Sequence, residues 1–253
     1  MTAVRLTYIG GPTILLELAG LRLLTDPTFD PAGGEYHGPA STLYKTQDPA
    51  VSAELINAID AVLLSHDHHA DNFDAAGRLS ATAASRIITT VAGAGRLGGR
   101  AKGLEAWQSV ALQAPHQPQL RITATPCRHG PAGGDRGPVI GFLLKCDDRT
   151  IYVSGDTVWY EGVEEVARRF DPDLAVLFMG AARVAAAGPA HLTMTAEDGV
   201  KAARAFPRAM IVPVHFEGWR HFSESRADIE KGFAAAGMSD RLRWPVPGRS
   251  EEV

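Results

Sequence analysis

Apolar positions along the chain fall into short runs, and the first three of these runs predict an antiparallel β-meander. They cover residues 5–9, 13–18 and 21–25, and Gly-Gly-Pro and Ala-Gly turns separate them. Similar runs, bounded by polar residues or by glycine, recur through the rest of the sequence. They predict further strands at 62–64, 87–90, 107–112, 120–125, 139–146, 150–153, 174–179 and 209–214.

Helical segments lie between these strands. We expect helices at 50–58, 72–84, 92–97, 160–170, 195–206 and 223–236. Helix 195–206 has a clear start signal, because Thr195 suits the N-cap and Asp198 occupies the capping-box position. Residues 29–50 are rich in Gly, Pro, Thr and Tyr and predict a loop over the functional site. Sheets covered by helices make a layered α/β protein, and no linker or strong repeat divides the domain expected over residues 1–253.

Composition and charge narrow the classes of function. The 253 residues carry a formal net charge of −4 and no basic stripe, so we expect no nucleic-acid partner. No apolar run approaches the roughly 18 residues that a membrane span needs, and the N-terminus shows no signal-peptide pattern. Two cysteines are too few for a disulfide scaffold. These features predict a reduced, cytoplasmic protein and leave its oligomeric state, including a homo-oligomer, open.

The densest group of metal-capable side chains follows the apolar run 62–64. Three histidines and two aspartates stand within the six residues His66-Asp-His-His-Ala-Asp71. Residues two apart in an extended segment project to the same side, so His66 and His68 can converge on one point, with Asp71 three residues further on. Imidazole and carboxylate groups are typical ligands of Zn²⁺. The cluster therefore predicts a metal site at the end of this strand.

More candidate ligands follow at long intervals. His129, Asp156 and His215 each come after an apolar, β-branched run that predicts a strand. Strands that end at one edge of a sheet bring the residues that follow them together. The spacing therefore indicates one shared site at a sheet edge.

The ordered set of a His-x-His pair at His66, the lone His129, the Gly-Asp-Thr at Asp156 and the late His215 resembles the metallo-β-lactamase-fold superfamily of metal-dependent hydrolases. Within it, the chain looks most similar to the branch with ascorbate-6-phosphate lactonase-like and N-acylphosphatidylethanolamine phospholipase D-like proteins. The resemblance extends from the opening Leu6-Thr-Tyr-Ile-Gly-Gly-Pro to His215. It implies an α/β fold, a four-layer αββα sandwich with metal bound at one edge between two sheets.

The resemblance also implies a role for each residue of the site. Six side chains are expected to hold one or two divalent cations, Zn²⁺ or Mn²⁺: His66, His68 and His129 for the first, Asp71 and His215 for the second, and Asp156 as the bridge. A water shared by two cations loses a proton near neutral pH and becomes the nucleophile, and Asp71 is expected to aim it. Asp26 is expected beneath the site, where such a carboxylate orients a ligand histidine.

The first motif departs from the family pattern His-x-His-x-Asp-His. One extra residue precedes Asp71, and Asn72 stands where the fourth histidine is expected. An amide oxygen is a weaker ligand than imidazole for a borderline metal. With Asn72 as a ligand, the second site is weak, empty or suited to a harder ion such as Mn²⁺. In the alternative, His69 turns inward and takes the missing role.

Four further residues are expected near the substrate. His191 is the candidate proton donor, because His-Leu-Thr-Met-Thr-Ala-Glu-Asp resembles a helix-preceding segment of lactonase-like relatives. Trp219 and His221 follow the last ligand and are expected to line the pocket. Arg183, on the preceding loop, is expected to pair with a substrate carboxylate or phosphate. An ordinary surface role is the alternative for each.

The predicted function is hydrolysis of a small-molecule ester, lactone or phosphodiester by a metal-bound hydroxide. A phospholipase D-like phosphodiesterase is one alternative, and it would need an exposed apolar entrance. A metal-binding pseudoenzyme or sensor is another, which Asn72 and the extra residue favour. The presence of Asp156 and His215 argues against it, since both would be free to change in an inactive site.

Overall fold

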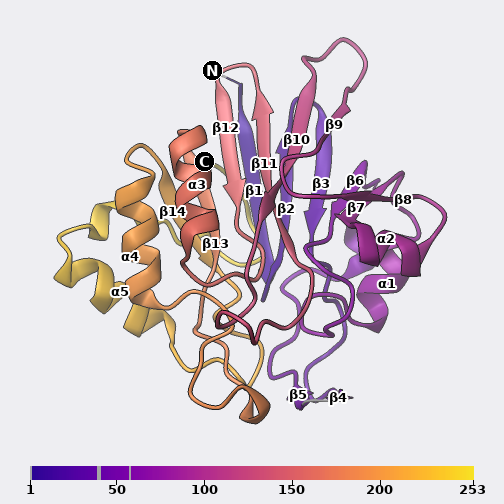
Figure 1. Cartoon of the computed structure of the whole chain (residues 1–253). Coiled ribbons are helices and arrows are strands. Elements are labelled where there is room, and N and C mark those ends of the chain that lie inside the picture. The colour runs from indigo at the N-terminus through magenta and orange to yellow at the C-terminus, as the bar shows by residue number, and fades with distance from the viewer. Residues whose placement is uncertain (1, 39–40, 57) are drawn as a thin grey trace.

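A computed structural model describes residues 2–38, 41–56 and 58–253 of the chain. Two β-sheets pack face to face, and helices cover the outer face of each sheet (Figure 1). These four layers are the αββα sandwich that we expect from the resemblance. No helix among the described residues is long and apolar enough to cross a membrane.

The first sheet has seven strands in the order β15-β1-β2-β3-β6-β7-β8. They are β1 (Val4–Gly10), β2 (Thr13–Leu18), β3 (Leu21–Thr25), β6 (Ala61–Leu63), β7 (Ile87–Thr90), β8 (Ala101–Leu104) and β15 (Ser250–Glu252). The first three form the predicted antiparallel meander, and β6 to β8 continue it in parallel. The apolar pattern does not predict the edge strands β8 and β15, because their residues carry few apolar side chains.

The second sheet has six strands in the order β14-β13-β12-β11-β10-β9. They are β9 (Ser109–Leu112), β10 (Leu120–Pro126), β11 (Ile140–Cys146), β12 (Arg149–Val153), β13 (Leu174–Phe178) and β14 (Met210–Val214). β10 and β12 are both antiparallel to β11, and β12 to β14 are parallel. The strands β10, β12, β13 and β14 therefore all end at the same edge of the sheet.

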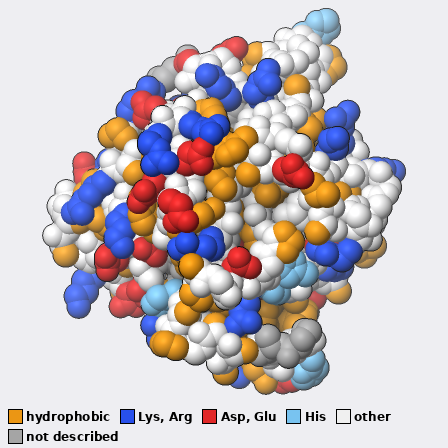
Figure 2. All heavy atoms as spheres, in the orientation of Figure 1, with side chains coloured by type: hydrophobic (Ala, Val, Ile, Leu, Met, Phe, Trp, Pro, Cys, Tyr) orange, Lys and Arg blue, Asp and Glu red, His pale blue; other side chains and the backbone are white. Residues whose placement is uncertain are grey.

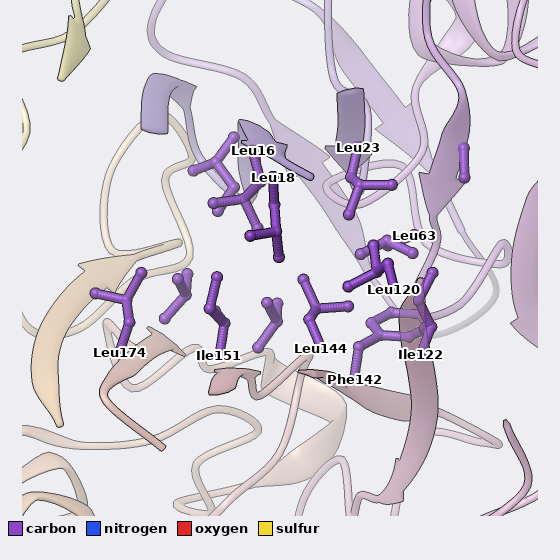
Figure 3. Packing of buried hydrophobic residues seen from close by; sticks show 14 of the residues in the cluster. Leu16, Leu18, Leu23, Leu63, Leu120, Ile122, Phe142, Leu144, Ile151 and Leu174 are labelled. Carbon is purple, nitrogen blue, oxygen red and sulfur yellow. The ribbon is translucent and has the colours of Figure 1, made fainter. Parts of the chain in front are cut away.

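The core lies between the two sheets. Leu16, Leu23 and Leu63 from the first sheet face Leu144 and Ile151 from the second, all of them fully buried (Figure 3). Alternation along each strand sends one set of side chains into this layer and the other set toward the helices. The edge of this closed core carries the loops that follow the strands.

Helices complete the outer layers (Figure 1). α1 (Ala75–Ala81) and α2 (Val91–Leu97) cover the first sheet, and α3 (Glu161–Arg169), α4 (Ala196–Ala205) and α5 (Arg226–Ala235) cover the second. The capping box of Thr195 and Asp198 at α4 is confirmed. α5 begins after Ser225, which caps it in the same way.

Residues 29–50 differ from the expected loop. They contain a hairpin of β4 (Glu35–His37) and β5 (Thr42–Tyr44), at the bottom of Figure 1. The helix predicted at 50–58 is only a 3₁₀ turn, η1 (Ala53–Leu55). Positions 39, 40 and 57 of these two predictions lie outside the described residues. Strands and turns of three residues are too short to leave a periodic pattern in the sequence.

Candidate metal centre

Two groups of potential metal ligands meet at the edge where β6, β10, β12 and β14 end. Within each group the ligand atoms lie within 4.8 Å of one another. The first group is His66, His69 and His129, and the second is Asp71, Asp156 and His215. In the space-filling view, histidine side chains reach the surface on the lower part of the molecule (Figure 2).

Three ring nitrogens converge in the first group. The Nδ1 atom of His69 lies 2.9 Å from Nε2 of His66 and 3.3 Å from Nε2 of His129. His129 directs its Nδ1 at the carbonyl oxygen of Leu192, 2.9 Å away, so the ring proton sits there and Nε2 presents a lone pair. Burial is the main cause that lowers the pKa of His69 to about 4. A neutral imidazole is the form that binds a cation.

Asp156 faces both groups with one oxygen each. Its Oδ2 lies 3.6 Å from Nε2 of His129, and its Oδ1 lies 3.4 Å from Nε2 of His215. His215 in turn is 3.6 Å from Oδ2 of Asp71. Burial lowers the pKa of His215, but Asp156 and Asp71 outweigh this and raise it to about 10. The two buried carboxylates thus create a position that favours positive charge.

Glycine allows the loop after β12 to approach the end of β6. Gly155 has a φ of +61°, and a Cβ atom there would lie 2.7 Å from the oxygen of Ile140 and 3.1 Å from Cβ of Ser65. A side chain at this position would therefore push apart the two segments that carry His66 and Asp156. This is the physical reason for the glycine in the Gly-Asp-Thr motif.

Asp26 lies beneath the first group, and it reaches a histidine through a serine. Its Oδ1 accepts hydrogen bonds from the backbone N–H of Ser65, at 2.8 Å, and from the Ser65 hydroxyl, at 2.7 Å. The same hydroxyl oxygen lies 2.9 Å from Nδ1 of His66. Since the serine proton points at Asp26, the hydroxyl accepts from Nδ1–H, and Nε2 of His66 is free to bind a cation. The sequence analysis assigned no role to Ser65.

His68 is the expected ligand that the structure does not bring into either group. Its side chain is exposed, and its Nε2 lies 2.8 Å from the backbone oxygen of Arg136 in the glycine-rich loop 130–138. His69 occupies the first group instead, because the extra residue before Asp71 lets the chain turn one position later. Asn72 is fully buried, and neither of its amide atoms has a hydrogen-bond partner among the residues that the structure describes.

A small pocket that opens to solvent lies over both groups. His69, Asp71, His129 and His221 form its floor and side. The remaining lining residues are mostly apolar: Ser41, Leu43, Arg136, Ala182, Val184 and Leu192. Arg136, from the glycine-rich loop 130–138, also lines the pocket, and the sequence pattern does not single it out. His221 is placed at the pocket as expected.

The other expected substrate residues lie outside this lining. Arg183 is exposed and contacts His191, with Nε and Nη2 at 3.2 and 3.1 Å from the two ring nitrogens. The role of His191 as proton donor therefore stays a prediction. Trp219 is buried, 3% exposed, with Lys45 5.5 Å from its ring centroid and the Tyr36 ring centroid at 5.2 Å. Its indole anchors the loop that carries His221.

The donor set fits divalent cations. Buried polar atoms usually have hydrogen-bond partners, yet several at this edge have none among the described residues: Oδ1 of Asp71, Oδ1 of Asp156 and both ring nitrogens of His215. These atoms have polar neighbours close by, but the geometry is not that of hydrogen bonds. Imidazole nitrogen and carboxylate oxygen are the ligands of Zn²⁺, and both also suit Mn²⁺.

Residues 21–216 match the family model of the beta-lactamase superfamily domain. The chain belongs to this family. The UPF0173 metal-dependent hydrolase of Pelotomaculum thermopropionicum is 26% identical over 99% of the chain and 100% of its own length. The crystal structure of isothiocyanate hydrolase from Delia radicum gut bacteria is similar with a TM-score of 0.83 and 25% identity, over 98% of the chain and 100% of that protein.

A possible metal-dependent hydrolase from Veillonella parvula is also similar, with a TM-score of 0.84 and 21% identity over 99% of the chain and 100% of that protein. The family match and these structures confirm the metallo-β-lactamase fold expected from the sequence. The narrower likeness to lactonase-like and phospholipase D-like proteins stays a prediction.

Proposed function

We propose that this beta-lactamase superfamily protein is a metal-dependent hydrolase of a small molecule with an ester, lactone or phosphodiester bond. The observation that carries the proposal is the position of Asp156, whose two oxygens face the two groups at 3.6 Å from His129 and 3.4 Å from His215. One carboxylate between two sets of ligands is the arrangement of a two-metal hydrolase. Relatives with similar full-length sequences carry the name metal-dependent hydrolase, which supports the proposal.

In this proposal, His66, His69 and His129 would hold the first cation, Asp71 and His215 would hold the second, and Asp156 would contribute one oxygen to each group. Bound there, the cations supply a water of lowered pKa and polarise the oxygen of the scissile group. Among the described residues, Oδ1 of Asp71 is buried without a hydrogen-bond partner, and Asp71 lines the pocket; this atom would accept a hydrogen bond from a water bound there and orient it. The tautomers set by Leu192 and Ser65 keep Nε2 of both histidines available.

The lining of the pocket supports a class of substrate. Leu43, Ala182, Val184 and Leu192 offer an apolar wall, which packs against a hydrocarbon part of the substrate and excludes water from the reacting bond. Arg136 is positioned to bind an electronegative group, since guanidinium donates paired hydrogen bonds to carboxylate and phosphate. A small molecule with an apolar body and one polar or anionic end fits this lining.

The test is a substrate panel on protein stripped of metal and then reloaded with Zn²⁺ or Mn²⁺. The panel holds an aryl ester, a γ-lactone, an aryl phosphodiester and, because of the Delia radicum gut bacterial relative, an isothiocyanate. We expect hydrolysis of at least one compound by the reloaded protein alone, and a loss of at least about 100-fold in kcat in Asp71→Asn. His116→Ala, an exposed change, is the control and keeps the rate. Reloaded protein that binds metal and hydrolyses no compound would favour a metal sensor instead.

A further inference from the structure

The histidine missing from the first motif has a spatial counterpart elsewhere in the chain. Asn72 stands at the position of that histidine in the sequence. Near Asp71, the structure places the ring of His221, with Nε2 only 3.0 Å from Oδ2 of Asp71. The side chain of His221 is 10% exposed, and its Nδ1 is buried with no hydrogen-bond partner in the described part of the chain. We propose that His221 is a ligand of the second cation, in place of the histidine that Asn72 replaces.

The distance between His221 and Asp71 fits neighbouring atoms in one coordination shell. Two ligand atoms held about 2.1 Å from a cation lie roughly 3.0 to 3.4 Å apart at octahedral and tetrahedral angles. His221 and Asp71 are 3.0 Å apart, and Asp71 and His215 are 3.6 Å apart, both measured from Oδ2 of Asp71. Oδ2 of Asp71 therefore stands between two imidazole nitrogens. With Oδ1 of Asp156 at 3.4 Å from His215, the ligand atoms of Asp71, Asp156 and His215 lie within 4.8 Å of one another, and His221 adjoins this group through Asp71.

The chain around His221 is fixed from several sides, so the ring is held where it lies. The backbone oxygen of His221 accepts a hydrogen bond of 2.9 Å from Arg183, and the N–H of Arg220 donates to Tyr44 at 3.0 Å. Trp219 forms a β-bridge with Lys45. The loop after β14 is thus connected to β5 on one side and to the loop after β13 on the other, and little freedom has to be lost when His221 binds a cation.

The inference rests on the proposed function, and metal counting separates the two. Zn²⁺ is titrated into metal-free wild type and His221→Ala against a chromophoric chelator, which gives the affinity of each equivalent without reference to activity. We expect two equivalents in the wild type. In His221→Ala, the affinity for the second equivalent of Zn²⁺ should fall at least 10-fold. The affinity for the first equivalent should stay within about 2-fold of the wild-type value. His116→Ala, in the β9–β10 connection at the top of Figure 1, is the matched histidine control and keeps both.

The remaining outcomes also decide the question. Asn72→Ala should still bind the second equivalent of Zn²⁺. If Asn72→Ala lost this equivalent while His221→Ala kept it, the inference would be overturned and Asn72 would be the ligand. A wild type that binds one equivalent would overturn the inference and leave a mononuclear enzyme standing. A wild type that binds none would contradict the proposed function itself. Thermal unfolding of the metal-free variants shows whether each is folded, and His221→Gln serves if His221→Ala is not.

Discussion

At the scale of single residues, the hydroxyl of Ser65 controls which nitrogen of His66 is free. It donates to Asp26 at 2.7 Å and lies 2.9 Å from Nδ1 of His66. Burial raises the pKa of Asp26, and this carboxyl stays in place through the two hydrogen bonds from Ser65. Groups that orient a ligand in this way commonly contribute about 10- to 100-fold to metal affinity.

Ser65→Ala should therefore weaken binding of the first cation by about 10- to 100-fold and leave the fold intact. The matched control is Ser109→Ala, which removes a hydroxyl contact of 2.8 Å with Thr123 on the second sheet. Competition with a chromophoric chelator gives both affinities. Equal affinities in the two variants would mean that Ser65 does not orient His66.

The assignment of His69 in place of His68 gives a second prediction. His69→Ala removes the nitrogen at the centre of the first group, so we expect the affinity of the first equivalent to fall by more than about 100-fold. His68→Ala removes only the contact with Arg136 and should keep both equivalents. Equilibrium metal titration of the two variants decides, and the opposite result would restore the ligand expected from the motif.

These residues show what sequence can and cannot predict about the site. Asp156, His129 and His215 follow strands, so their position at one sheet edge could be predicted from the strands alone. The choice between His68 and His69 could not, because it depends on where the chain turns after β6. From its position after His215, His221 was expected at the substrate. The sequence does not show that its ring approaches Asp71 to 3.0 Å.

At the scale of elements, a buried ion pair joins three segments near the site. Nζ of Lys45, just after β5, lies 2.9 Å from Oδ2 of Asp74, and the side chains are 4% and 0% exposed. Asp74 also caps α1 through the N–H of Gly77 and accepts from the N–H of Phe29. The pair holds the β4–β5 hairpin against the loop that carries the first group.

Lys45→Met should lower the free energy of unfolding by about 3 kcal/mol, because removing one partner leaves the other charge buried and unpaired. The matched control is Arg168→Met, which removes an exposed pair with Glu164 and should change stability by less than about 0.5 kcal/mol. Urea unfolding of metal-free protein measures both. A change of similar size in the two variants would show that the buried pair does not anchor the hairpin.

The β4–β5 hairpin and strands β8 and β15 are strand elements that the sequence did not predict. Each of these strands has only three or four residues, and charged side chains and glycine are among them. Pairing with neighbouring strands stabilises them, and not the intrinsic strand propensity of their residues. The longer strands and the capped helices α4 and α5 carry periodic apolar positions and clear start signals, so the sequence predicted them closely.

At the scale of the whole molecule, the two ligand groups join the two sheets. His69 and Asp71 follow β6 of the first sheet, whereas His129, Asp156 and His215 follow strands of the second. A cation held between them therefore links both halves of the sandwich. Binding to the folded state alone stabilises it by about 2.7 kcal/mol at a free concentration 100 times the Kd.

Removal of metal with a chelator should accordingly lower Tm. For a domain of this size, about 2.7 kcal/mol corresponds to a shift of roughly 5 to 10 °C. Calorimetry of stripped and Zn²⁺-reloaded protein measures it, and Asp156→Ala should show a much smaller shift. An unchanged Tm in the wild type would mean that no cation links the two sheets.

The central claim is that two cations lie on either side of Asp156. The most direct test is a crystal of Zn²⁺-loaded protein with anomalous diffraction at the zinc edge. We expect two peaks about 3.5 to 4 Å apart, one bound by Nδ1 of His69 and the other between Asp71 and His215. Absence of anomalous density at both groups, or density bound by His68 with His69 turned away, would contradict it.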